Sequence, residues 1–146
     1  MKGYPRWFVP LLITAAIIVF MSGLLLAPSF TDRVWQLELG WRASGAIRIL
    51  TSASHVMTGF IIVACLGALL PIHIRAGWAR RVNHLSGLLC VVALLVLAVG
   101  GVGVLYLGDE TLIAVNSTAH FALGLLFFLV ATVHMINGFR IRLANK

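Results

Sequence analysis

The sequence predicts an all-α membrane protein, folded as an up-down bundle of four transmembrane helices. Of its 146 residues, 61% are hydrophobic and 10% are charged, a composition typical of membrane proteins rather than of soluble domains. The apolar residues form four runs of about 20 residues or more, which is the length that crosses the hydrocarbon core of a bilayer. Because four spans fill the chain, residues 1–146 are expected to form a single transmembrane domain.

The first span is predicted over residues 7–27. Lys2 and Arg6 precede this apolar run, as basic residues also precede the apolar region of a signal peptide. Its length of about 21 residues suits a spanning helix better. Pro10 falls in the first turns, where a helix tolerates proline, and Pro28 is expected to end the helix.

Residues 29–50 are predicted to form the longest segment outside the membrane. Trp35 and Trp41 stand here among charged and aliphatic residues, a mixture typical of an amphipathic stretch in the membrane interface. A connection of about 20 residues is long for a compact bundle, and long loops are often functional. We therefore weigh two interpretations equally, a docking or lid segment and a plain linker.

The second span is predicted over residues 51–74 and contains His55 and His73. These histidines are 18 residues apart, which is about five full turns of an α-helix, so they are expected on one face. Pro71 is expected to bend the last turn of this span.

The third span is predicted over residues 84–107 and the fourth over residues 113–139. Near its outer end the third span carries Gly100, Gly101 and Gly103, which allow close approach of a neighbouring helix or of a flat ring. A short turn with two acidic residues connects the two spans.

The charged residues indicate the orientation of the bundle. Eight of the eleven cations lie at the two termini and in the loop after the second span: Lys2, Arg6, Arg75, Arg80, Arg81, Arg140, Arg142 and Lys146. All four acidic residues lie in the two other connections. By the positive-inside rule both termini are cytoplasmic, and we expect a multi-pass protein of a bacterial inner membrane. The net charge of +7 therefore reflects topology and not a nucleic-acid partner.

The fourth span carries one histidine near each end and no other ionisable group between them. His120 and His134 are 14 residues apart, so they lie roughly 21 Å apart and within about 40° of the same side of the helix. An imidazole in hydrocarbon needs a partner, and haem iron is one that neutral imidazole binds well. The alternative is two histidines that are hydrogen-bonded to neighbouring helices.

The second and fourth spans form a weak internal repeat. Each contains His-x-x-x-Gly, at His55 and Gly59 and again at His120 and Gly124, and each ends with a second histidine near a basic segment. A glycine one turn after the histidine removes the side chain that would collide with a porphyrin lying against the helix. Two copies, on spans that run in the same direction, are more specific than one.

The bundle topology predicts how the histidines pair, because the second and fourth helices are parallel and face each other across the core. His55 and His120 then lie near the outer surface, which predicts a haem clamped between helices two and four. At the inner site His134 is the clear ligand, and its partner is His73 or His84. His73 is the favoured partner because it shares a face with His55, although its 18-residue spacing puts it about one turn deeper than a 14-residue partner. His84 lies at the start of a helix.

These motifs, the 14-residue histidine pair and the two His-x-x-x-Gly starts, resemble those of the small four-helix members of the dihaem cytochrome b superfamily. Similar proteins include the membrane cytochrome b subunits of formate dehydrogenases and hydrogenases, and the bis-histidine core of quinol:cytochrome c oxidoreductases. The resemblance covers about residues 48–142, and the 18-residue spacing on the second span departs from the pattern. It implies two b-type haems, each held by two axial histidines, that move electrons across the membrane.

Arginines near the expected sites are candidates for binding haem propionates. Arg48 and Arg42 lie on the outer side, close in sequence to His55, and Arg75 or Arg140 lies on the inner side. The alternative for each arginine is an anchor at the membrane edge or a topology signal.

The sequence favours an electron-transfer subunit over an enzyme that acts alone, because no nucleophile–base pair, paired carboxylates, phosphate loop or soluble domain is visible. We expect the chain, embedded in membrane lipids, to relay electrons between the quinone pool and a redox partner, either a subunit or a cytochrome. The long outer segment favours a periplasmic partner. Asn137, His84 and Ser86 are candidates for a quinone site on the inner side.

Two other functions account for less of the sequence. A proton or metal transporter would use the five histidines, but it predicts that they converge on one site, whereas they sort into two layers. A structural membrane anchor of a larger complex leaves the repeated His-x-x-x-Gly unexplained.

Overall fold

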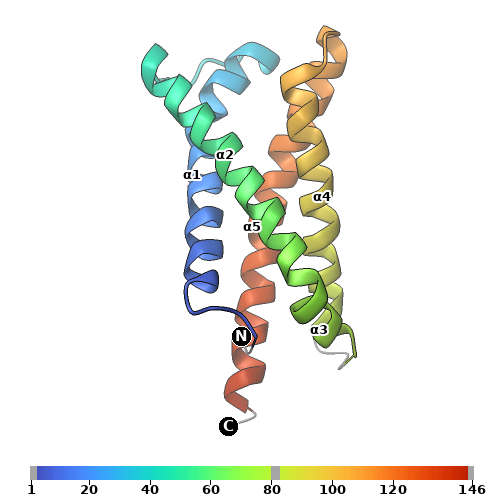
Figure 1. The fold of residues 1–146 in the computed structure, drawn as a ribbon. Helices are drawn as coiled ribbons and strands as arrows, with labels where there is room; N and C mark the ends of the chain where they lie inside the picture. Colours follow the sequence, from blue (N-terminus) through green and yellow to red (C-terminus); the bar gives the residue numbers. More distant parts are fainter. Residues whose placement is uncertain (1–2, 80–82, 145–146) are drawn as a thin grey trace.

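The computed structural model, which describes residues 3–79 and 83–144, is a bundle of helices (Figure 1). Its elements are α1 (Phe8–Trp35), α2 (Gly45–Leu69), a π-helical turn (Leu70–Ile74), α3 (Arg75–Ala79), α4 (His84–Tyr106) and α5 (Glu110–Ala144). The described residues contain no strand. Four stretches are long and apolar enough to cross a membrane: α1, α2 with its continuation to Ala79, α4 and α5. The predicted fold class is confirmed, and the chain is a multi-pass membrane protein.

Each long helix packs beside two others. α1 packs against α2 and α5, and α4 packs against α5 and α2. α2 and α5 therefore lie across the bundle from each other, and α2 runs obliquely through it (Figure 1). The start of α1, α3 and the C-terminal end of α5 lie at one end, which we call the inner end (Figure 1). The connections from α1 to α2 and from α4 to α5 lie at the opposite, outer end (Figure 1).

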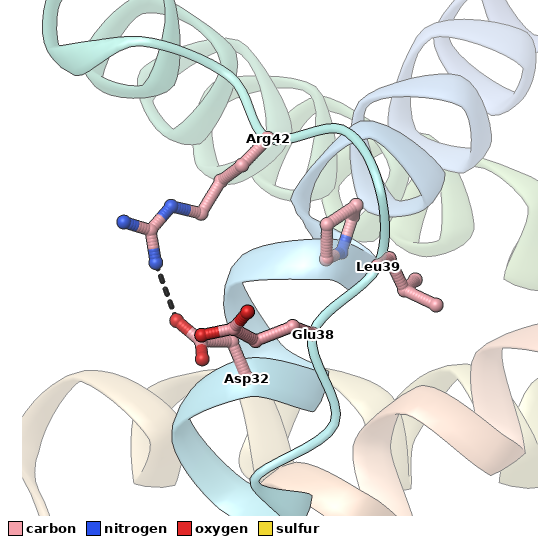
Figure 2. A pocket seen from close by; sticks show the side chains of 5 residues that line it. Asp32, Glu38, Leu39 and Arg42 are labelled. Carbon is pink, nitrogen blue, oxygen red and sulfur yellow. Dashed lines mark hydrogen bonds and ion pairs between the residues drawn. The ribbon is translucent and has the colours of Figure 1, made fainter.

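The segment predicted outside the membrane over residues 29–50 is shorter in the structure. α1 and α2 both extend into it, so that residues 36–44 alone join the two helices. Charged side chains do not stop a helix once it has left the hydrocarbon, so hydropathy underestimates the helix length. Arg42 of this connection forms an ion pair with Asp32 near the end of α1 (Figure 2). A docking or lid role for the connection stays a prediction.

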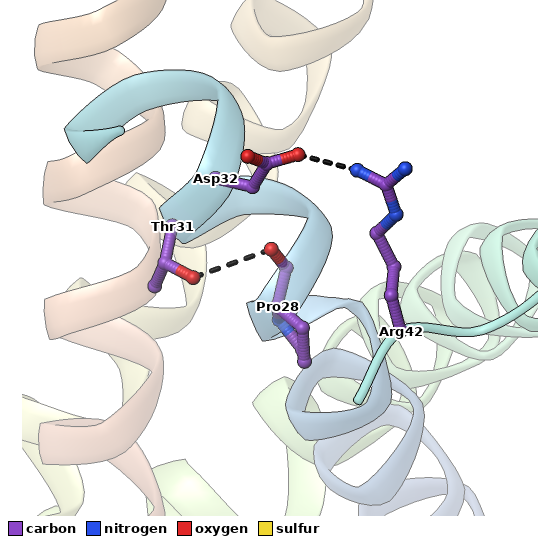
Figure 3. A network of polar contacts seen from close by, with 4 residues as sticks. All are labelled: Pro28, Thr31, Asp32 and Arg42. Carbon is purple, nitrogen blue, oxygen red and sulfur yellow. Dashed lines mark hydrogen bonds and ion pairs between the residues drawn. The ribbon is translucent and has the colours of Figure 1, made fainter. Parts of the chain in front are cut away.

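α1 does not end at Pro28, as predicted, but continues to Trp35. Proline removes one backbone hydrogen bond, yet membrane helices tolerate it because nearby groups satisfy the freed backbone atoms. Pro28 is fully buried, and the Thr31 hydroxyl donates a hydrogen bond of 3.2 Å to the Pro28 carbonyl (Figure 3). The helix ends instead where Gln36 adopts a left-handed conformation, with φ 52°.

Most large apolar side chains face outward, as a surrounding of lipid requires. The small buried core comes from α1 and α2 and includes Ala15, Ile62 and Leu66. Farther across the bundle, Phe20 of α1 stacks on Phe128 of α5 with ring centroids 3.8 Å apart.

The topology prediction depends on eight cations, and those that the structure describes lie toward the inner end. Arg6 precedes α1, Arg75 begins α3 and Arg140 lies in the last turns of α5. Lys2, Arg80, Arg81 and Lys146 lie outside the described residues, as does the side chain of Arg142. The positive-inside rule then predicts that the inner end is cytoplasmic.

Cysteine labelling tests this orientation. In a background in which Cys65 and Cys90 are replaced by alanine, the variants Arg6→Cys and Asp109→Cys should react with an impermeant maleimide from opposite sides of the membrane. Asp109 precedes α5 at the outer end, so its cysteine should be labelled in intact cells. Labelling of both variants from the same side would contradict the four-span topology.

Candidate functional site: two facing histidine pairs

Four histidines meet as two pairs across the bundle. His55 of α2 lies opposite His120 of α5, with ring centroids 6.2 Å apart and ring planes at 71°. His73 of the π-helical turn lies opposite His134 of α5, with ring centroids 6.1 Å apart and ring planes at 85°. The first pair lies nearer the outer end and the second nearer the inner end, and we call them the outer and the inner pair.

His84 lies apart from both pairs. It begins α4, its side chain is exposed, and its ring packs edge-on against Trp78 with centroids 5.8 Å apart. The structure therefore brings His73, and not His84, to His134. Whether either histidine is a ligand stays a prediction.

The two pairs are equally close although their spacings along the helices differ. His120 and His134 are separated by about 21 Å of helix, whereas His55 and His73 would be separated by about 27 Å of straight α-helix. The oblique course of α2 shortens its projection along α5 (Figure 1). The π-helical turn, which closes its ring with one more residue than an α-helix, also shortens the path. His73 therefore lies opposite His134 although four more residues separate His55 from His73 than separate His120 from His134.

At Pro71, where the sequence predicts a bend, the structure has this π-helical turn. Pro71 lies at the start of the turn and lacks the N–H that an α-helical hydrogen bond would use. The Tyr4 hydroxyl accepts a hydrogen bond from the backbone N–H of His73 and donates one to the carbonyl of Ala68, each 3.2 Å long. Tyr4, which the sequence analysis did not identify, thus stabilises the turn that contains His73 through two hydrogen bonds.

The separation within each pair fits two axial ligands of one metal. Imidazole nitrogen binds first-row metals at about 2 Å, so two imidazoles on opposite sides of one iron place their ring centroids about 6 Å apart. The observed separations are 6.2 and 6.1 Å. Direct hydrogen bonding between the two rings would instead bring them closer together.

His55 is held by α1. Its Nδ1 lies 2.9 Å from the carbonyl oxygen of Val19 and 3.2 Å from the Oγ of Ser22. The Ser22 hydroxyl donates its own proton to the Ile18 carbonyl, 2.6 Å away, so it acts as an acceptor toward His55. We therefore assign the proton to Nδ1 and the lone pair to Nε2. This is the tautomer of a metal-binding histidine whose second nitrogen donates to a carbonyl.

His134 is held by the start of α4. Its Nδ1 lies 2.9 Å from the Oγ of Ser86 and 3.2 Å from the Nδ2 of Asn83. The Ser86 hydroxyl donates to the Oδ1 of Asn83 at 2.6 Å, and the Nδ2 of Asn83 donates to the His134 carbonyl at 2.9 Å. Because the Ser86 hydroxyl donates to Asn83, we assign the Nδ1–H of His134 as the donor to Ser86, with the lone pair on Nε2. The Nδ2 of Asn83 is itself a donor, so its hydrogen bond to His134 is the one to the carbonyl, and its contact with Nδ1 is not a hydrogen bond.

His120 has less support from the chain. Its Nδ1 is buried and, within the part of the chain that the structure describes, has no hydrogen-bond partner of normal geometry. The carbonyl of Leu97 in α4 interacts with this ring at poorer geometry. A buried ring nitrogen without a good partner is rare in proteins. The described chain therefore does not fix the tautomer of His120, in contrast to His55 and His134.

Glycines of neighbouring helices lie directly behind three of the four rings. A Cβ added at Gly23, Gly87 or Gly100 would lie 3.1, 3.2 or 3.3 Å from an imidazole atom, closer than an ordinary van der Waals contact. The expectation that Gly100 allows a close approach is thus met by the His120 ring. Because these positions lack a side chain, the three imidazole rings can lie close to the backbone of the neighbouring helix.

The two glycines of the repeated motif face open space. A Cβ added at Gly59 would meet no described protein atom within 4 Å, and one added at Gly124 would meet Leu97 at 4.0 Å. Packing within the chain therefore does not require glycine at these positions. A flat ring held between the histidines would require glycine at both positions.

Of the two outer arginines that could bind propionates, Arg42 is already paired with Asp32. Arg48 is exposed on the first turns of α2, on the outer side of His55. At the inner end, Arg75 follows the turn that carries His73, and Arg140 lies beyond His134 on α5. Arg48 is thus the remaining outer candidate.

An open pocket of about 340 Å³ lies beside the inner pair. It is lined by Asn83, His84, Leu85, Ser86 and Asn137. The three residues that the sequence proposed for a quinone site therefore line one pocket. Ser86 also contacts the Nδ1 of His134, so the pocket adjoins a residue that holds the inner pair.

A second pocket, of about 240 Å³, lies at the outer end between the last turns of α1 and the connection to α2 (Figure 2). Its lining residues are Pro28, Asp32, Glu38, Leu39 and Arg42. Carboxylates and a guanidinium therefore meet on the face that an outer partner would approach.

The histidines meet in twos and do not form a larger cluster. Among residues 3–79 and 83–144, no three His, Cys, Asp or Glu side chains gather where they could hold a metal ion alone. Two facing imidazoles would suit a metal whose other ligands come from a macrocycle. Comparisons with protein-family models, with curated proteins and with solved structures find no match. The function therefore has to be inferred from the site itself.

Proposed function

We propose that this protein is a dihaem b-type cytochrome subunit that relays electrons across a membrane. It would connect the quinone pool with a redox partner, which is a neighbouring subunit or a cytochrome on the outer side. The observation that carries the proposal is the pair of facing imidazoles at each end of the bundle, at 6.2 and 6.1 Å. Bound between these histidines, each haem would supply one-electron iron chemistry.

The chain's own residues account for binding and orientation. His55 and His120 would hold the outer haem, and His73 and His134 the inner one. Hydrogen bonds from Nδ1 of His55 and of His134 keep Nε2 as the ligating atom. The open space at Gly59 and Gly124 admits a flat ring, and the apolar spans exclude water from it.

The depth of the two pairs supports a relay across the membrane. They are separated by about 21 Å along α5, so one pair lies toward each face of a hydrocarbon core that is about 30 Å thick. Phe20 and Phe128 stack between the two levels, because Phe128 lies between His120 and His134 in α5. A single buried site at the centre would not connect the two faces.

The surroundings of each pair support the assignment of partners. The inner pocket of about 340 Å³ offers amide, hydroxyl and imidazole groups to a ligand with carbonyl oxygens, such as a quinone head group. The outer end presents Asp32 and Glu38 beside a short connection, where a redox partner would dock (Figure 2). We place the protein in a bacterial inner membrane with both termini in the cytoplasm, from its charge distribution.

The alternative functions account for fewer observations. A histidine-based transporter needs its imidazoles along one path or at one site, whereas these four stand in two separate pairs. A structural anchor gives no reason for imidazoles to face each other across the bundle.

Haem content tests the proposal. Purified protein should contain about two haems per chain in a pyridine haemochrome assay, and acidic acetone should extract them, since the sequence has no Cys-x-x-Cys-His motif for covalent attachment. Because the ring planes are nearly perpendicular, at 71° and 85°, both haems should give a strongly anisotropic low-spin EPR signal. The double variant His120→Ala/His134→Ala, purified in the same way, is the control for adventitious haem. Wild-type protein without haem would refute the proposed function.

A further inference from the structure

The inner pair differs from the outer pair in what holds its ligand. His55 donates its Nδ1 proton to a backbone carbonyl of α1, 2.9 Å away. His134 donates its proton to a side chain, Ser86, whose hydroxyl passes a hydrogen bond of 2.6 Å to Asn83. Side-chain hydrogen bonds can be rearranged by a ligand, whereas the carbonyl within a packed helix stays in place.

The same two side chains line the inner pocket. Asn83 and Ser86 contribute to its wall together with His84, Leu85 and Asn137. Each of the two therefore contacts His134 on one side and the pocket on the other. A molecule in the pocket that bonds to Ser86 or Asn83 must compete with, or strengthen, the hydrogen bond to the His134 ring.

We propose that Asn83 and Ser86 are positioning residues that couple the occupancy of the inner pocket to the redox potential of the inner haem. This inference rests on the proposed function, because it needs a haem on His134. The coupling follows from the chain Asn83 Oδ1, Ser86 Oγ and His134 Nδ1, and the ligand class is a neutral molecule with carbonyl or hydroxyl oxygens.

The direction of the effect follows from the chemistry of the ligand. A hydrogen bond from Nδ1–H to an acceptor makes the imidazole a stronger electron donor, which stabilises the oxidised iron and lowers the potential. Loss of the acceptor should therefore raise the potential. By thermodynamic reciprocity, a pocket ligand that shifts the inner potential must itself bind with different affinity to the oxidised and the reduced protein.

Redox titrations of the purified full-length chain in lipid nanodiscs test the inference. Ser86→Ala removes the acceptor and should shift the oxidised-to-reduced equilibrium of the inner haem about tenfold toward the reduced form, which is about 59 mV for one electron. The potential of the outer haem, measured in the same sample, should not change. Asn83→Ala should also raise the potential of the inner haem. Ser86→Thr keeps a hydroxyl and should therefore retain the wild-type potential. Thr132→Ala is the matched control, because its hydroxyl bonds only to the Phe128 carbonyl of its own helix at 2.8 Å in the described chain.

A second arm tests the coupling to the pocket. Heptylhydroxyquinoline N-oxide, a redox-inactive quinol analogue, should shift the inner potential of the wild-type protein and of Thr132→Ala, but not that of Ser86→Ala. If two haems are bound and their potentials are the same in wild type, Ser86→Ala and Asn83→Ala, the inference is wrong while the proposed function stands. An analogue that shifts the inner potential equally in wild type and in Ser86→Ala would overturn the coupling through Ser86. A protein without haem would instead remove the proposed function.

Discussion

His120→Ala should retain about one haem per chain and lose the outer one. His55 alone cannot complete the axial coordination, because its ring is fixed against α1 by the Val19 carbonyl and lies 6.2 Å from the ring that is removed. The inner pair lies about 21 Å farther along α5, so its haem should keep its spectrum and potential. His134→Ala should show the converse, with a surviving haem of different potential. Haem quantitation and a redox titration of each variant measure both effects.

Leu126→Ala is the matched control for this experiment. Leu126 lies on α5 between the two histidines, and the residue is 55% exposed, so its truncation changes the lipid-facing surface and not the site. It should retain about two haems. If His120→Ala also retained two low-spin haems, the outer pair would not be a haem site.

The outer pair, His55 with His120, could be predicted because it depends on two regular features. The spacing of 14 residues and the repeated His-x-x-x-Gly are local patterns, and the up-down topology places the second and fourth helices face to face. The structure has His55 opposite His120 for that reason. Hydropathy also located all four spans, although the helices extend several residues beyond the predicted boundaries at Pro28 and residue 51.

The groups that hold the rings could not be predicted, because they come from other helices. Ser22 and Val19 contact His55 from α1, and Asn83 and Ser86 contact His134 from the start of α4. A serine in an apolar span has no local signature that distinguishes a ring partner from a hydroxyl bonded to its own helix. Only the three-dimensional packing of α1 on α2, and of α4 on α5, reveals these contacts.

The partner of His134 was open for a related reason. Sequence spacing measures length along a straight helix, and by that measure His73 lies too deep. The tilt of α2 and the π-helical turn at Pro71 are tertiary properties that the spacing does not contain. Tyr4, which bonds to the backbone of His73, is about 70 residues away in the sequence.

His73→Ala should lose the inner haem, whereas His84→Ala should retain both. The His73 ring lies 6.1 Å from His134 across the bundle, and the backbone of His73 is fastened by Tyr4 at 3.2 Å. The His84 ring is exposed and packs on Trp78, so removing it should leave the contacts of the inner pair intact. Haem quantitation, together with the potential of the surviving haem, measures the difference between the two variants.

The comparison of these two variants is decisive because each makes the same chemical change at the same end of the bundle. The surviving haem in His73→Ala should have the potential found in His134→Ala, since both variants would retain only the outer site. A His73→Ala protein with two low-spin haems, beside a His84→Ala protein with one, would assign the inner ligand to His84. That result would require α4 to turn its first residues toward His134, where Ser86 and Asn83 already contact the ring. The hydrogen bonds of Ser86 and Asn83 to His134 would have to break for that movement, which is the physical reason to expect His73.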